Sequence, residues 1–266
     1  MIRYFIHIGY DGSVYSGWQR QNNTQNTIQE WIENTLYKIF KSKVTVYGCG
    51  RTDAGVHASQ YVFHIDLPEA PSFDLKFRLN KNLPNDISVF EIIEVKGNQH
   101  CQHNAVIRSY DYFIHLTNDP SLHRHSSFYG YLELDLDNMK KVTSLFLNTY
   151  DFRPLCKHPD LYKNTLCHIK NCDLFVNEHQ GRLQFKITSN RFLRGMVRYC
   201  VFTILQIGLG NMTILELQQI LHQEKKFSEK RLALPNGLFL SKIEYPFVEL
   251  KDVHQLIKIL KVGLEY

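Results

Sequence analysis

The sequence predicts an α+β protein with a largely antiparallel sheet. Segments that alternate as strands and segments with helical apolar spacing follow one another without the regular strand–helix–strand period of a parallel sheet. The clearest helix is expected from Thr27 to Phe40, with Thr27 as the N-cap and Glu30 as its capping-box partner. Strands are expected over 2–10, 44–47, 60–66, 87–95, 109–116, 168–176, 182–189 and 237–245.

The other helices and the domain boundary come from the same patterns. Further helices are expected over 73–83, 137–148, 191–208 and 213–222. A composition shift near residues 100–107 divides the chain, so we expect an N-terminal α+β domain over 1–105 and a C-terminal α+β domain over 106–266. A chain of 266 residues can bury a sizeable core.

Composition indicates a folded cytoplasmic protein. Hydrophobic residues make up 44% and aromatic residues 13%, which is globular composition. The first residues are too polar for a signal peptide, and no apolar run approaches the ~18 residues of a membrane span. The 6 cysteines form no CxxC pair, so we expect reduced thiols. The net charge of +5 is compatible with nucleic-acid binding without demonstrating it.

One glycine-rich segment, residues 48–58, presents a carboxylate among small residues. Asp53 is predicted to lie on a loop between two strands, between Gly50 and Gly55, where another molecule can approach the backbone closely. Arg51 can hold that carboxylate ionised or bind a phosphate. An ordinary turn with a surface Arg–Asp pair is the alternative, because a short motif is only a hypothesis until its context confirms it.

The histidines and cysteines invite a zinc interpretation, but their spacing argues against one. Structural zinc sites usually show two pairs of ligands at CxxC or HxxxH intervals, and no two such pairs occur here. The residues considered are His100, Cys101, His103, Cys156, His158, Cys167 and His168. Gly208 and Gly210 end a predicted helix and lack the preceding strand of a dinucleotide fingerprint. We therefore expect no metal and no cofactor.

A row of arginines and a pair of tyrosines have two possible interpretations. Arg191, Arg194 and Arg198 recur at three and four residues, so they would lie along one edge of the predicted 191–208 helix. Such a row is either a solvated rim or an RNA-binding surface. Tyr110 and Tyr112 share one face of their strand, where they either pack in the sheet or stack on an extruded base.

Taken together, the motifs resemble the tRNA pseudouridine synthase A family. The most specific element is Gly50-Arg51-Thr52-Asp53-Ala54-Gly55-Val56-His57-Ala58, which is similar to the segment around that family's nucleophilic aspartate. The supporting segments occur in the family's order from Tyr10 to Pro246. They are residues 10–12, 17–21, 28–30, 79–87, 108–112, 150–152, 191–198, 234–240 and 245–246.

The resemblance implies a fold and a reaction. The fold is two ferredoxin-like (RRM-like) halves sharing a largely antiparallel sheet, with a central basic catalytic cleft. The reaction converts uridine to pseudouridine at positions 38, 39 and 40 of the tRNA anticodon arm, by breaking the N1–C1′ bond, turning the base and joining C5 to C1′. The implied enzyme is a homodimer that grips tRNA and uses neither a cofactor nor a metal.

The resemblance also assigns roles to residues. It implies that Asp53 is the nucleophile, Arg51 helps to extrude the base, Tyr110 stacks on the base and Arg198 pairs with Asp53. An ordinary aspartate is ionised at neutral pH and needs no activating base, but a stacked uridine must be flipped out before it can react. The residues expected to contact RNA are Arg20, Arg108, Arg191 and Arg194.

Two departures from the family pattern leave other functions open. Gln102 and Cys167 stand where relatives usually carry arginines that contact RNA. A catalytically silent RNA-binding or tRNA-folding protein is therefore one alternative. A metal-dependent hydrolase, suggested only by the histidines and cysteines, is another.

Overall fold

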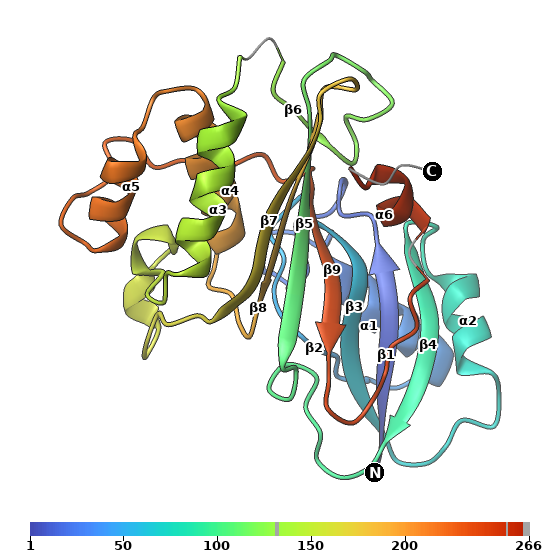
Figure 1. Cartoon of the computed structure of the whole chain (residues 1–266). Coiled ribbons are helices and arrows are strands. Elements are labelled where there is room, and N and C mark those ends of the chain that lie inside the picture. The colour runs from blue at the N-terminus through green and yellow to red at the C-terminus, as the bar shows by residue number, and fades with distance from the viewer. Residues whose placement is uncertain (131–132, 254, 263–266) are drawn as a thin grey trace. The chain divides into compact units, whose positions relative to one another are not determined.

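The chain forms two compact units. The computed structural model describes residues 1–130, 133–253 and 255–262 (Figure 1). The first unit comprises residues 1–106 and 239–259, and the second comprises 107–238 and the described residues from 260 onward. The border after residue 106 falls next to the expected one, but 239–259 joins the first unit, whereas we expected it in the C-terminal domain. In the ranges that the structure describes, no helix is long and apolar enough to cross a membrane.

The first unit is built on a mixed sheet whose strand order is β4, β1, β3, β9 (Figure 1). The central strand β1 pairs antiparallel with both neighbours, so that Ile6 lies opposite Phe63 and Ile92. The last strand, β9, runs parallel to β3, with His57 opposite Phe239. The strand bounds are β1 Ile2–Tyr10, β2 Tyr47–Gly48, β3 His57–Leu67, β4 Ile87–Val95 and β9 Leu238–Glu244.

Two helices with side-chain caps accompany this sheet. They are α1 (Ile28–Phe40) and α2 (Leu75–Asn82), capped by Thr27 and Asp74. The Thr27 hydroxyl accepts from the Glu30 N–H at 3.4 Å, as expected of the N-cap. The Glu30 carboxylate lies 3.9 Å from the Arg20 guanidinium. The expected helix and its Thr27 cap are thus confirmed, because the apolar face and the cap signal agree. Glu30 does not complete the expected capping box, because one of its carboxylate oxygens faces Arg20 and the other has no hydrogen-bond partner among the described residues.

The second unit contains an antiparallel sheet with strand order β5, β8, β7. Tyr112 lies opposite Phe185, and the short strand β6 runs parallel to β5. Mostly antiparallel pairing in both units confirms the predicted α+β class. The strand bounds are β5 Ile107–His115, β6 Ser127–Phe128, β7 Ile169–Asn177 and β8 Arg182–Ser189. The helices of this unit are α3 Leu136–Leu147, η1 Arg153–Leu155, η2 Pro159–Leu161, α4 Met196–Gly208 and α5 Ile214–Leu221. Helix α6, Gln255–Leu260, belongs to the first unit except for its last residue.

The helix expected over 191–208 begins later than its apolar pattern suggested. Helix α4 starts at Met196, and Gly195 precedes it in a left-handed conformation with φ 74°. A residue at that φ cannot continue a right-handed helix, so the chain before it is irregular. The prediction that Arg191, Arg194 and Arg198 share one helical edge is therefore wrong, and Arg198 alone lies on α4.

The two strands next to the loop that carries Asp53 also differ from the expectation. Strand β2 covers only Tyr47–Gly48 where we expected 44–47, and β3 begins at His57 where we expected residue 60. The earlier start of β3 comes from pairing of its first residues, His57 and Ala58, with β9. That long-range pairing has no signal in local alternation.

Replacing Gly195 with alanine should destabilise the protein more than the same change at Gly210. Both glycines have φ near +70° (74° and 72°), so each alanine variant costs about 1 kcal/mol in backbone conformation. At Gly195 the new Cβ would also lie 3.2 Å from Leu232 Cδ2, whereas nothing lies within 4 Å at Gly210. Urea unfolding of both variants measures the difference. Equal losses would contradict a steric role for Gly195.

Candidate active site

The loop between β2 and β3 holds Asp53 as the first residue of a tight turn, with Ala54 and Gly55 at its tip. The Val56 N–H donates to the Asp53 carbonyl at 3.2 Å, and Gly55 between them has φ 75°. The Asp53 side chain is half-buried, while Arg51 is exposed. This confirms the expected position of Asp53 on a loop between two strands. The turn presents a carboxylate that solvent and another molecule can reach.

Backbone hydrogen bonds from a second loop hold this turn in place. That loop, residues 11–27, joins β1 to α1. The Trp18 N–H donates to the Thr52 carbonyl at 3.2 Å, and the Gly55 N–H donates to the Tyr15 carbonyl at 3.2 Å. The two bonds flank Asp53 in the sequence. They limit the freedom of the turn without using the carboxylate itself.

Two glycines allow the loops to approach this closely. A Cβ on Gly12 would lie 2.0 Å from the Val56 carbonyl oxygen, and one on Gly17 would lie 2.6 Å from the Thr52 carbonyl oxygen. Gly17 also has φ 93°, which side-chain-bearing residues resist. Both positions therefore require glycine, and the reason is the backbone of the Asp53 turn.

Tyrosine hydroxyls support the same turn from the sheet. The Tyr61 hydroxyl donates to the Gly50 carbonyl at 2.5 Å, and the hydroxyls of Tyr10 and Thr52 are 2.8 Å apart. Burial raises the pKa of Tyr61 well above its ordinary value, so the phenol stays protonated as a donor. Trp18 stacks on Tyr61 at 3.9 Å between ring centroids.

Tyr15 is held by a carboxylate of another loop. Its hydroxyl donates to Asp86 Oδ1 at 2.5 Å. Burial, followed by this hydrogen bond, raises the pKa of Tyr15, so it too remains a donor at neutral pH. Because the Tyr15 carbonyl accepts from Gly55, the Tyr15–Asp86 bond extends the support of the Asp53 turn to the segment before β4.

His57 follows the turn and has a structural partner. Its side chain is fully buried and stacks on Phe239 with 4.5 Å between ring centroids. Its Nδ1 accepts from the Gly12 N–H at 3.1 Å and lies 3.2 Å from Asp11 Oδ1. A ring nitrogen that accepts from Gly12 carries no proton to donate to Asp11. His57 therefore anchors the Gly12 loop.

The second unit contains the other residues with expected roles in the reaction. Tyr110 is half-buried on β5 and meets Phe192 edge-on, with ring centroids 5.0 Å apart. Arg198 is half-buried on α4, and its Nε donates to the Ala233 carbonyl at 2.7 Å. Arg108 is half-buried on β5, opposite Ser189. The structure thus places Asp53 and Arg51 in the first unit and these three residues in the second.

The remaining RNA-contact candidates differ in how far they are engaged within the protein. The Arg20 guanidinium lies 2.8 Å from the Glu33 carboxylate on α1, so part of its charge is already compensated. Arg191 donates to Asn164 Oδ1 at 3.2 Å. The Arg194 side chain is exposed.

The two departures from the family pattern have different surroundings. Gln102 is exposed. Cys167 is fully buried, and burial raises the pKa of its thiol to about 12. A buried neutral thiol is inert and is not available to RNA, so the Cys167 substitution acts on packing.

Sequence reasoning assigned no role to the residues that hold the Asp53 turn. Tyr10, Gly12, Gly17 and Trp18 lay in recognised motifs, and that clustering was the available signal. Tyr61 gave none, because a tyrosine in an alternating strand looks like any core residue.

Comparison with known proteins shows the family of this chain. A family model described as tRNA pseudouridine synthase matches residues 6–104 and 143–246. The chain is 35% identical over 250 residues to the tRNA pseudouridine synthase A of Porphyromonas gingivalis, covering 92% of this chain and 98% of that protein. It is 35% identical over 249 residues to the Bacteroides thetaiotaomicron protein of the same name, covering 92% and 91%.

These matches define the class of this α+β protein as a pseudouridine-forming isomerase. The chain belongs to the tRNA pseudouridine synthase A family. The family predicted from the motifs is thereby confirmed.

Replacing Gly12 with alanine should disturb the Asp53 turn, whereas Gly50→Ala should leave the fold intact. The Gly12 Cβ would collide with the Val56 carbonyl, but nothing lies within 4 Å of a Cβ on Gly50. We expect Gly12→Ala to lose roughly 1–3 kcal/mol of unfolding free energy and Gly50→Ala much less. A displaced Asp53 should also lower turnover on tRNA by about 100-fold. Wild-type stability and turnover in Gly12→Ala would show that the close approach is dispensable.

Proposed function

We propose that this protein converts uridine to pseudouridine in the anticodon stem-loop of tRNA, at positions 38, 39 and 40. The observation that carries the proposal is Asp53, half-buried at the start of a turn held by hydrogen bonds to Tyr15 and Trp18. A catalytic group must be held close to its reactive geometry, because a misplaced group lowers the rate. The two backbone hydrogen bonds supply that rigidity.

In the proposed reaction the N1–C1′ bond of uridine breaks, the base turns and a C5–C1′ bond forms. The base loses a proton from C5 and gains one at N1, so substrate and product have the same composition. No oxidant, reductant or group donor is required, and we propose that no cofactor or metal takes part in the chemical step. Asp53 is the proposed nucleophile, because an ionised carboxylate can form and release a covalent bond.

The proposed roles of the neighbouring residues follow from the need to flip the uridine. Unstacking a base costs a few kcal/mol, which stacking on an aromatic ring offsets. Tyr110 presents a half-buried ring for this purpose. We propose that Arg51, exposed beside Asp53, helps to extrude the base, and that Arg198 pairs with the Asp53 carboxylate.

We further propose how the enzyme holds its substrate. Arg20, Arg108, Arg191 and Arg194 are the proposed RNA contacts, in two ferredoxin-like halves that share a sheet around a basic cleft. The enzyme acts as a homodimer that grips the tRNA. The cytoplasm is the proposed location, since tRNA is the substrate and the six cysteines are all free.

Asp53→Ala should abolish pseudouridine formation while leaving tRNA binding within about twofold of wild type. Asp173→Ala is the matched control, because Asp173 is an exposed aspartate on β7 of the second unit. The measurement is incubation with unmodified tRNA, followed by carbodiimide labelling and reverse transcription. We expect stops at positions 38–40 with wild type and Asp173→Ala alone.

The outcomes of this experiment separate the candidate functions. Retained turnover in Asp53→Ala would remove Asp53 from the mechanism. If wild type binds tRNA but gives no stops, the protein is a silent RNA binder. Stops elsewhere in the tRNA would overturn the proposed target site.

Arg194→Ala should weaken tRNA binding and reduce its salt dependence. Each phosphate contact adds a slope of about 0.7–0.9 to the fall of log K with log salt, so the slope should drop by nearly one. Arg78→Ala is the control. Arg78 lies on α2, and its guanidinium is 3.9 Å from the centroid of the Phe73 ring, so it is already engaged within the protein. Binding isotherms from low to moderate salt test this. An unchanged slope for Arg194→Ala would exclude a phosphate contact there.

A further inference from the structure

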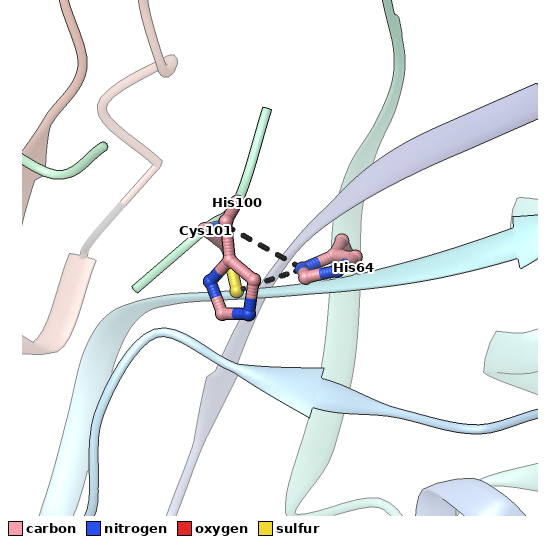
Figure 2. Close-up of side chains that lie close together, drawn as sticks. All are labelled: His64, His100 and Cys101. Atoms are coloured by element: carbon pink, nitrogen blue, oxygen red, sulfur yellow. Dashed lines mark hydrogen bonds between the residues drawn. The ribbon is translucent and has the colours of Figure 1, made fainter. Parts of the chain in front are cut away.

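A group of metal-ligating side chains lies in the first unit, apart from the Asp53 loop in sequence. His64 comes from β3, and His100 and Cys101 come from the segment that follows β4 (Figure 2). One ligand atom of each residue lies within 4.8 Å of the other two. His64 and Cys101 are buried and His100 is half-buried.

The distance between the sulfur and one imidazole nitrogen is close to that of a tetrahedral zinc site. Cys101 Sγ is 3.2 Å from His64 Nδ1. Two ligands at the Zn–S distance of about 2.3 Å and the Zn–N distance of about 2.05 Å lie about 3.5 Å apart at a tetrahedral angle. A shift of a few tenths of an ångström in the sulfur–nitrogen distance would therefore bring these two atoms to the separation of two zinc ligands.

The local charges are compatible with a cation bound through a thiolate. Arg3 is the nearby positive group, and its guanidinium is paired with the Asp66 carboxylate at 2.7 Å. In the metal-free protein the Cys101 thiol donates to the Tyr47 carbonyl at 2.9 Å. Metal binding would replace that S–H bond with a sulfur–metal bond and release the proton to solvent.

We propose that Cys101, His64 and His100 form a zinc-binding site, with His103 as the fourth ligand. Thiolate and imidazole together are the ligand set that zinc favours. The His103 ring is exposed, and its centroid is 4.3 Å from that of His100, so a side-chain rotation brings it to the metal. The ion ties the segment after β4 to β3. The search of the sequence for closely spaced ligand pairs missed this group, because His64 lies far from His100 and Cys101 in the chain.

Cobalt substitution tests the site with a signal that only a thiolate gives. The protein is made without an affinity tag, freed of metal and titrated with Co²⁺ and then Zn²⁺. Wild type should develop a sulfur-to-cobalt charge-transfer band that Zn²⁺ removes, with about one zinc bound per chain by mass spectrometry. Zn²⁺ should also raise the melting temperature.

Two variants make the result specific. Cys101→Ser keeps a hydroxyl donor for Tyr47 but should lose the charge-transfer band and weaken zinc binding by about 100-fold or more. Cys172→Ser, a buried cysteine of the second unit, should behave like wild type. Circular dichroism without metal checks that both variants fold.

Two results would overturn the proposal. If wild type shows no charge-transfer band and no zinc, Cys101 and His64 form only a hydrogen-bonded thiol–imidazole pair beside His100. If Cys101→Ser binds zinc as wild type does, the metal sits on surface histidines. Asp53→Ala should bind zinc normally, so failure here leaves the proposed tRNA reaction untouched.

Discussion

The close approach of two backbones is the constraint on which the candidate active site depends. Gly12 and Gly17 have no side chain where the Asp53 turn passes, and a Cβ at Gly12 would lie 2.0 Å from the Val56 carbonyl oxygen. That proximity allows the Trp18 and Gly55 amides to bond across the two loops. Because both partners in each bond are backbone groups, these bonds hold the turn without involving the Asp53 side chain.

Buried tyrosines make this arrangement rigid. Tyr61 and Tyr15 each donate a short hydrogen bond, to Gly50 and to Asp86, and burial raises the pKa of both. A phenol that cannot ionise near neutral pH is a permanent donor. Stacking of Trp18 on Tyr61 then orients the ring whose hydroxyl meets the turn. The aromatic residues Tyr15, Trp18 and Tyr61 thus support the Asp53 turn.

Residues of one type differ in their pairing and burial, as the arginines and the cysteines illustrate. Arg20 pairs with Glu33, whereas Arg194 is exposed to solvent. Cys167 is a buried, inert thiol. Cys101, in contrast, lies beside the imidazole of His64 and that of its chain neighbour His100. Charge and residue type in the sequence could not separate these cases, because pairing and burial are properties of the fold.

The sequence by itself determined the family, the α+β class and the position of Asp53 on a loop between strands. Local signals were sufficient there: the apolar face of α1, the Thr27 cap and strand alternation all act within a few residues. Only the tertiary structure decided the late start of α4 at Gly195, the parallel pairing of β9 with β3 and the return of 239–259 to the first unit. It also decided that Tyr61 supports the turn and that His64 meets Cys101. Contacts between distant residues leave no periodic trace in the chain, because they depend on which surfaces meet after the local elements have formed.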